Sequence, residues 1–446
     1  TFKQAFSGGE ISPEMFGRIA DNKFQQGAAT MRNFIAKPQG PAQNRPGFAY
    51  VNEVKDSTKA TRLLDFTFNT TQTMVIEMGN LYFRFHTEGQ TLLYSAGSAW
   101  SNSTNYTVGD IALQGGTNYY AKTAHSNSQP PNATNWYALP ANLTYEIPHP
   151  YLEAELFDVH YVQSADVITL VHPNHAPREL RRLGATKWEL KVIDFGTPLA
   201  APTGVSVSAY IPSSSSTNND TYEDHIYAVT AVKANLIDES NKSSNATVSN
   251  NIYVTGAKNT ISWNSVTGAS RYRVYKDQGG IFGYIGETTS TSIIDNNIAP
   301  DFSRTPPNHE NDFIGTGNYP GAVSYFEQRR VFAGTNNAPQ NIWMTKSGTE
   351  SNMSFGLPIR DDDRIEFRVA AREANTIRHI VPLTNLLMLT GSAEWRITSV
   401  NSDAITPTSI SVKPQSYVGA NNSQPVIVNN SLVYGAARGG HVRELG

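Results

Sequence analysis

Residues Val159–Phe195 read VHYVQSADVITLVHPNHAPRELRRLGATKWELKVIDF, and the organisation of the chain is most easily seen from them. An alternating run ends at Ser164-Ala165-Asp166, and an apolar run follows over Val167–Val171. A turn with two prolines comes next, and another strand begins near Arg178. Short strands separated by polar turns are the pattern of an antiparallel sheet.

The same outline of strand, polar turn, apolar strand, second turn and amphipathic strand recurs four times. The four other stretches are Arg62–His86, Val323–Thr345, Arg378–Thr398 and Pro425–Leu445. If an insert of about 42 residues is removed from the first gap and one of about 108 from the second, the units follow one another at roughly 55 residues, near the size of one propeller blade. The spacing therefore predicts a β-propeller-like body interrupted by inserted domains.

Composition favours an all-β protein of several domains. The chain has 446 residues, more than one hydrophobic core usually serves. Hydrophobic residues make up 39% and charged residues 16%, and much of the remainder is Asn, Ser, Thr, Gly and Pro. This balance suits strands and turns better than helices.

Charge and cysteine content exclude several classes of site. The formal net charge is -3, so the protein as a whole is not a basic nucleic-acid binder, although a local basic lining is compatible with it. There is no cysteine, which excludes disulfides, thiolate metal ligands and cysteine nucleophiles. No charged start with an apolar centre and no run of 18 apolar residues occurs, so we expect a soluble protein without a membrane anchor of its own.

The first 50 residues show almost no strand pattern before Phe48. Residues Asp21–Phe34 have the apolar spacing of a short amphipathic helix, and several prolines then favour an extended path. An extended segment rich in aromatic residues is typical of an arm laid along a neighbouring subunit, or of a strap on its own domain. The residues expected to make a subunit contact are Phe6, Phe16, Arg18 and Phe34.

Residues 6–51, FSGGEISPEMFGRIADNKFQQGAATMRNFIAKPQGPAQNRPGFAYV, carry a distinctive series of motifs. Further motifs follow in order: Gln163–Asp166, His172-Pro173, Pro177-Arg178, Leu180, Trp188, Phe326–Arg330, Ala333–Thr335, Asp362-Asp363 and Gln415–Gly419. In this order they closely resemble the nozzle proteins of short-tailed (podovirus-type) phages, the tail tubular protein B family.

The resemblance implies a structural virion protein located in the phage tail. Members form a homo-oligomeric ring, a hexamer, through which DNA leaves the capsid. The implied partners are an upper tail or adaptor ring of the tail tubular protein A type, tail fibres and the phage DNA in the channel, and no cofactor is implied. The propeller-like region of the family usually continues further, so we expect an incomplete set of blades up to Gly446.

Ser98–Leu139 is the first expected insert. Its Trp100, Tyr106 and Trp136 follow the arrangement of small chitin-binding-type carbohydrate modules, whose exposed rings stack on sugars. They support the alternative function, a tail adhesin or tail-spike-like hydrolase that recognises host surface glycans. Alternatively, Trp100 and Trp136 form the core of so small a module, which then serves as a spacer or decoration.

The second expected insert, Ala201–Pro300, has alternating strands around Trp263 and resembles a fibronectin type III sandwich. Such a fold indicates display or spacing and no specific activity. The resulting domain plan is 1–50 arm, 51–97 first blade, 98–140 carbohydrate-module-like insert, 141–199 second blade, 200–304 fibronectin-like insert and 305–446 further blades.

No catalytic constellation is recognisable, so we expect no enzyme. His149, His160, His172 and His175 come close in sequence to Asp158 and Asp166, without an H-E-x-x-H or G-x-S-x-G motif.

Glu153 and Glu155 would share one face of an extended segment. Asp361-Asp362-Asp363 is expected to be a solvated turn rather than a metal site. Gln328-Arg329-Arg330 is expected to carry solvated charge or a salt bridge to a neighbouring subunit, with DNA as another possible partner. A host scaffold protein is a third reading, and it would predict an even blade count without inserts.

Overall fold

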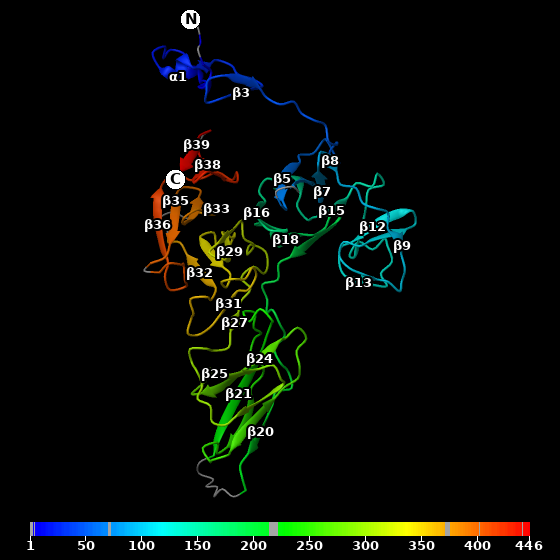
Figure 1. The fold of residues 1–446 in the computed structure, drawn as a ribbon, viewed down its shortest axis with the longest axis vertical. Helices are drawn as coiled ribbons and strands as arrows, with labels where there is room; N and C mark the ends of the chain where they lie inside the picture. The colour runs from blue at the N-terminus through cyan, green and yellow to red at the C-terminus, as the bar shows by residue number, and fades with distance from the viewer. Residues whose placement is uncertain are drawn as a thin grey trace. The chain divides into compact units, whose positions relative to one another are not determined.

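The computed structural model describes residues 3, 5–69, 73–213, 222–370, 375–400, 402–438 and 440–446. The chain divides into two units, one of residues 1–53 and 88–91 and one of residues 54–87 and 92–446. The prediction of an all-β protein is confirmed, since nearly all regular structure is strand (Figure 1). Among the described residues, no sheet closes on itself, and no helix is long and apolar enough to cross a membrane.

The first unit has little regular structure. Its elements are β1 (Gly9–Glu10), η1 (Pro13–Met15), α1 (Asn22–Gln25), β2 (Gly27–Ala28), β3 (Phe34–Ala36), β4 (Ala42–Asn44) and β8 (Gln90–Thr91). The helix predicted over Asp21–Phe34 is wrong in length. The observed helix ends early because Gly27 adopts extended backbone and pairs with Gly9. A side chain would not fit at position 27, since its Cβ would lie 2.3 Å from the Ile11 side chain.

Two antiparallel sheets share the largest core of the second unit. The first contains β5 (Arg62–Thr67), β6 (Thr73–Gly79), β7 (Tyr82–Thr87) and β15 (Glu146–Pro148); the second contains β16 (His160–Ser164), β17 (Val167–His172), β18 (His175–Gly184) and β19 (Lys187–Val192). Trp188 on β19 joins them, because its fully buried ring stacks on Phe85 and meets Phe66 edge-on.

Three further sheets follow along the chain. They are β28 (Ala322–Phe326), β29 (Arg329–Ala333), β30 (Asn341–Met344) and β32 (Ile365–Arg368); then β33 (Ile377–Pro382), β34 (Leu386–Thr390), β35 (Glu394–Thr398) and β36 (Ser411–Ser416); and finally the three-stranded β37 (Val426–Val428), β38 (Ser431–Gly435) and β39 (Val442–Leu445). Strands β27 (Asn308–His309) and β31 (Ser354–Phe355) form a separate antiparallel pair. In the chain, β27 precedes β28, and β31 lies between β30 and β32.

The five sheets correspond to the five sequence units, and their strands pair in chain order. Strand β28 contacts both β16 and β33, so the opening strands of three successive sheets are neighbours. Hydrogen bonds also connect β5 to β16. The Tyr161 hydroxyl donates to Asp65 at 2.6 Å, and the Gln163 side chain bonds to the backbone of Thr67.

The first insert interrupts the first sheet between β7 and β15. Its strands are β9 (Ser98–Ala99), β10 (Asn105–Tyr106), β11 (Ile111–Gln114), β12 (Thr117–Ala121), β13 (His125–Ser126) and β14 (Trp136–Ala138). They form a four-stranded sheet, β14-β12-β11-β9, and the pair β10-β13. A small separate core lies around Trp136.

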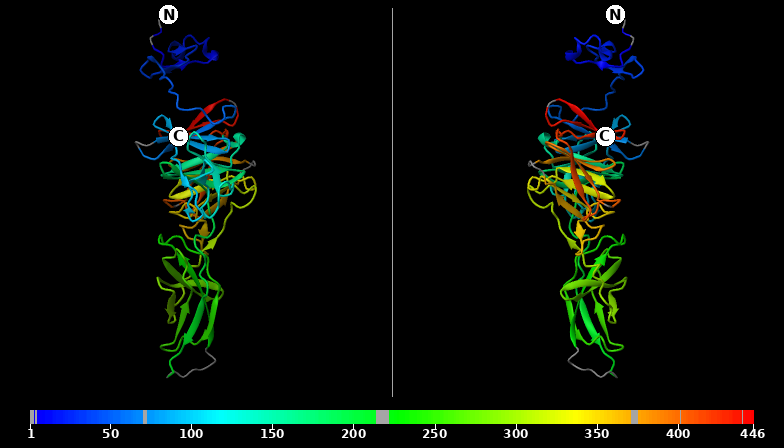
Figure 2. Two further views of the ribbon diagram at one scale, coloured as in Figure 1. Left: turned by 90° about the vertical axis from the view of Figure 1, so that its right-hand side faces the viewer. Right: turned by 90° about the vertical axis from the view of Figure 1, so that its left-hand side faces the viewer.

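The second insert is a sandwich of two antiparallel sheets. One has β20 (Ser206–Tyr210), β23 (Lys258–Ser262) and β26 (Ser292–Asp295); the other has β22 (Ala246–Asn250), β21 (Glu223–Val232), β24 (Arg271–Gln278) and β25 (Ile281–Thr288). Trp263 lies in the core between them, as expected from the sequence. Within the second unit the sandwich lies at one end, beyond β27 and β31 (Figures 1 and 2).

Candidate functional site

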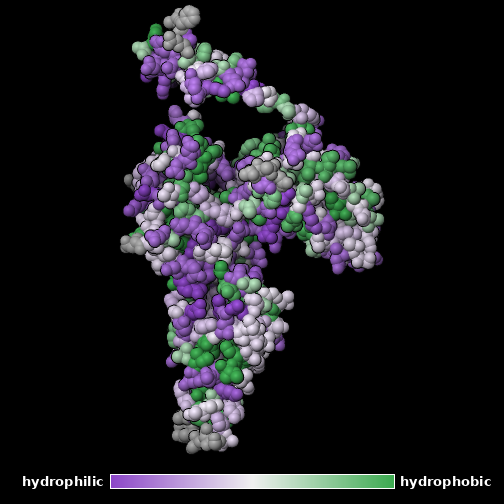
Figure 3. Space-filling view, viewed as in Figure 1, coloured by the Kyte–Doolittle hydropathy of each residue, from purple (hydrophilic) through white to green (hydrophobic). Residues whose placement is uncertain are grey.

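The residues predicted to contact another subunit lie on an open surface of the first unit. Phe16 and Phe34 are 43% and 49% exposed. Arg18 is exposed and Phe6 half-buried. On the face drawn in Figure 3, apolar side chains of this unit are scattered among hydrophilic ones.

A hollow of about 870 Å³ opens on the same unit. Its lining is largely apolar and consists of Phe6, Ala28, Thr30, Met31, Arg32, Phe34, Gln39, Gly40, Pro41 and Ala42. Two of the four predicted contact residues, Phe6 and Phe34, therefore border one concave surface. The structure contains no second chain, so the subunit contact itself stays a prediction.

The predicted sugar-stacking residues occupy different environments. Tyr106 and Trp136 are buried, with their rings edge-on at 5.0 Å, and His125 packs against both. Because these ring faces are covered by the insert's own side chains, the expectation that they stack on a sugar is wrong for this conformation. Trp100 is half-buried and packs on the same core, so the sugar-binding prediction rests on this ring alone.

The Gln328-Arg329-Arg330 turn does not carry solvated charge. Arg330 is fully buried, and its guanidinium donates to Glu179 on β18 and to Glu350, both at 2.7 Å. Arg329, 3% exposed, donates to three backbone carbonyl oxygens of Thr345, Asp361 and Asp363. Neither arginine is available to DNA, and Arg330 instead joins the second and third sheets.

The acidic turn Asp361-Asp362-Asp363 is only partly solvated. Asp363 is fully buried and its carboxylate accepts the backbone N–H groups of Gly356 and Arg360 at 2.9 Å. Lys346 lies 3.0 Å from Asp363 and 2.8 Å from Asp362. These partners engage the carboxylates of Asp362 and Asp363, and the expectation of a solvated Asp363 is wrong.

A pocket of about 220 Å³ lies where the opening strands meet. It is lined by residues of β16, β28 and β33 and by the segment around Gln424. Two buried imidazoles border it, His160 and His379, whose rings meet edge-on at 4.8 Å. Burial lowers the pKa of both, that of His379 to about 3, so both are neutral at physiological pH.

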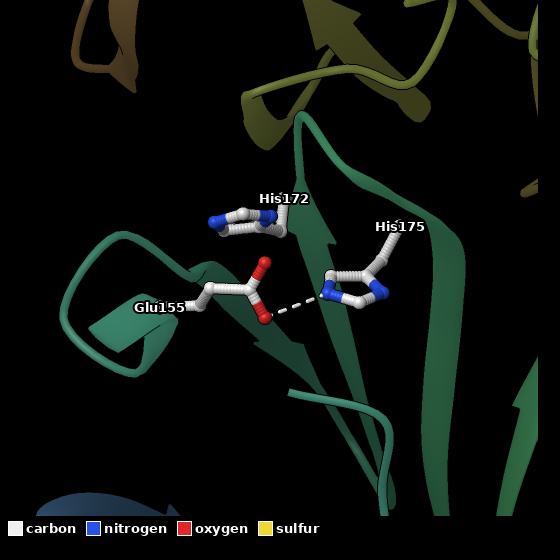
Figure 4. A group of neighbouring side chains, drawn as sticks. All are labelled: Glu155, His172 and His175. Carbon is white, nitrogen blue, oxygen red and sulfur yellow. Dashed lines mark hydrogen bonds and ion pairs between the residues drawn. The ribbon is translucent and has the colours of Figure 1, made fainter. Parts of the chain in front are cut away.

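A second group of titratable side chains lies outside the pocket. Glu155 comes from η2 (Glu153–Glu155), and His172 and His175 flank the turn between β17 and β18 (Figure 4). One ligand atom from each of the three lies within 4.8 Å of the others. His175 Nε2 is 2.8 Å from Glu155 Oε2.

Hydrogen bonds fix this group in place. The Leu152 N–H donates to Glu155 Oε2 at 2.9 Å, and the Asn174 side chain donates to Glu155 Oε1 at 3.3 Å. Burial raises the pKa of Glu155, but these bonds and the contact with His175 outweigh burial and lower the pKa to about 2. Burial lowers the pKa of His172, so the group combines a carboxylate with a neutral imidazole at pH 7.

One other acidic group, Glu310, Asp312 and Glu366, has the spacing of a metal site. Arg364 already forms ion pairs with all three carboxylates. Their charge is thus neutralised in part within the protein, and the group needs no ion.

Neither a scan against models of known protein families nor a search of curated protein sequences finds a match for this chain. The functional assignment therefore depends on the motifs and on the geometry. Sequence reasoning grouped the histidines with Asp158 and Asp166, whereas the carboxylate that joins His172 and His175 is Glu155. The segment Glu153–Glu155, expected to be extended, is a 3-10 turn that brings Glu155 to the hairpin.

Proposed function

We propose that this protein is a structural component of a short-tailed phage tail, a nozzle protein that assembles into a hexameric ring and conducts or gates DNA during ejection. The ordered motifs of residues 6–51 and of the later sheets support this assignment. The proposal includes a propeller-like body, which is supported by five sheets in chain order and by the contacts of β28 with β16 and β33.

The observation that carries the ring proposal is the missing core of the first unit. Among its described residues, Ile11 is the only large apolar side chain that is buried. Burying one such side chain contributes about 1.5–3 kcal/mol, whereas fixing the backbone costs about 1–2 kcal/mol for each residue. A conformation this open gains its missing stabilisation from a partner chain.

The exposed apolar side chains indicate where that partner binds. Besides Phe16 and Phe34, the large apolar residues of this unit that are at least two-fifths exposed are Ile19, Ile35, Phe48, Tyr50 and Val51. Apolar surface of this kind marks a contact with another protein. We assign it to contacts between copies in the ring and to the adaptor ring above it.

The DNA channel is proposed to lie on the axis of the ring. The pocket between the opening strands measures about 220 Å³, and it is far too small for a duplex whose major groove alone is about 12 Å wide. A ring of identical subunits encloses a wider axial space without any opening through one subunit.

The test is the mass of the assembled protein, measured by native mass spectrometry on purified tails and on the isolated full-length chain. We expect a hexamer in tails, and a monomer there would contradict the proposal. Replacing Phe16 and Phe34 together by Ser should raise the protein concentration needed for assembly at least tenfold. The matched control replaces Tyr210 and Tyr253, two aromatic residues of the sandwich that are 52% and 61% exposed, by Ser and should leave assembly unchanged.

A further inference from the structure

We propose that Glu155, His172 and His175 form a binding site for a divalent transition metal ion, with Zn²⁺ as its occupant. Two imidazoles and one carboxylate are a ligand set that suits Zn²⁺, and they leave a fourth position for water. The site is independent of the ring proposal. Figure 4 shows the Glu155 carboxylate directed toward both histidines from a separate chain segment.

The fold places the two histidines with little freedom. His172 ends β17 and His175 begins β18, and the two are paired across the turn made by Pro173 and Asn174. Their ring centroids are 5.3 Å apart. A tight turn between paired strands thus supplies two ligands in fixed register, and only small side-chain rotations are needed to bring them onto one ion.

The carboxylate is equally well positioned. Glu155 is held by the N–H of Leu152 and by the side chain of Asn174, contacts that orient a ligand without neutralising its charge. His172 is buried at the end of β17, and the Asn174 N–H fixes its ring. The carboxylate and this imidazole are therefore in place before an ion arrives.

Binding has an identifiable cost. The contact of His175 Nε2 with Glu155, now 2.8 Å long, must open when the ion takes its place, and the neutral ring then carries its proton on Nδ1. His172 Nδ1 accepts the Asn174 N–H at 3.1 Å, a bond that weakens when the ring turns toward the ion. Zn–N and Zn–O bonds of about 2.0–2.2 Å also require the ligand atoms to approach to roughly 3.3 Å of one another. We therefore expect a dissociation constant on the order of micromolar rather than picomolar.

The chain offers a natural control in Glu77 and His86. His86 Nε2 lies 3.0 Å from Glu77 Oε2, nearly the same pairing as that of His175 and Glu155. Within the described part of the chain, that pair is not joined by a third metal-ligating side chain. A carboxylate with one histidine should not hold the ion. Substitution of His86 therefore shows whether binding needs three ligands or only a carboxylate beside one imidazole.

The test is calorimetric titration of the tag-free full-length chain with zinc chloride at pH 7.5, with Co²⁺ absorption as a second readout. We expect one ion per chain and a tetrahedral Co²⁺ spectrum. Glu155→Gln should weaken binding at least tenfold, His172→Asn with His175→Asn should abolish it, and His86→Asn should leave it unchanged.

The absence of binding at 100 times the expected dissociation constant, about 100 µM for a micromolar site, would overturn the proposal. Binding that survives in Glu155→Gln and in the double histidine variant would overturn it as well, since the ion would then lie elsewhere. Glu155→Gln keeps the size of the side chain and most of its hydrogen bonds, so it tests the site even if the double variant does not fold. Circular dichroism of each variant checks that the sheets remain.

Discussion

The first unit and the five-sheet body of the second unit differ in the side chains that they bury. The body encloses fully buried aromatic side chains such as Trp188 and Phe332, and it buries charge as well, in Arg330 and its partner Glu179. The first unit leaves Phe16 and Phe34 open to solvent. The body is thus stabilised by contacts within the chain, whereas the proposed ring would supply the burial that the first unit lacks.

Removing the buried charge of the body should have the largest effect. Arg330→Ala removes the buried partner of Glu179, whose carboxylate then pairs only with Arg181, a side chain that is 39% exposed. We expect the free energy of unfolding to fall by about 3 kcal/mol. Urea denaturation of the full-length chain, followed by tryptophan fluorescence, measures this loss. Arg18→Ala, at an exposed arginine of the first unit, is the control and should change the value by less than about 0.5 kcal/mol. Equal losses in the two variants would remove the distinction between the regions.

The sequence predicted the strands better than their contacts. The apolar run Val167–Val171 falls within β17, and the five repeated stretches each became a sheet, because alternation and turn residues are local signals. The burial of Arg330 was not predictable, since a charged pair after a turn looks solvated and its partner Glu179 is 151 residues away. The site of Glu155 was missed for the same reason, because a short 3-10 turn decides which carboxylate reaches the hairpin.

Acid should destabilise the body through its buried histidines. Burial lowers the pKa of His149 and of His379 to about 3, below the ordinary value of 6.5. The unfolded chain therefore binds more protons between these values, and stability is complete above pH 6.5 and falls as the pH drops toward 3. From pH 8 to pH 5, we expect a loss of about 2 kcal/mol for each histidine.

Urea denaturation at the two pH values measures this loss, and replacing His149 and His379 by Gln should lower the pH dependence by about 4 kcal/mol. The buried His160 and His172, whose pKa values are also lowered, keep part of the dependence. His441→Gln is the control, since this histidine is exposed. An unchanged pH dependence in the double variant would show that other groups carry the acid sensitivity. Gln at these positions also costs stability at pH 8, so the comparison concerns the slope with pH and not the absolute value.

The smallest effect should come from the attachment of the first insert. Lys187 on β19 lies 2.7 Å from Asp110 of the insert, and both side chains are about one-third exposed. An exposed ion pair is worth roughly 0.2–1 kcal/mol, so Lys187→Ala should shift the urea midpoint only slightly. The buried hydrogen bond from the Tyr120 hydroxyl to the Trp188 carbonyl, 2.7 Å long, should matter more, and Tyr120→Phe is the matched variant. If Lys187→Ala proved the more damaging of the two, this surface charge and not buried contact would hold the insert to the body.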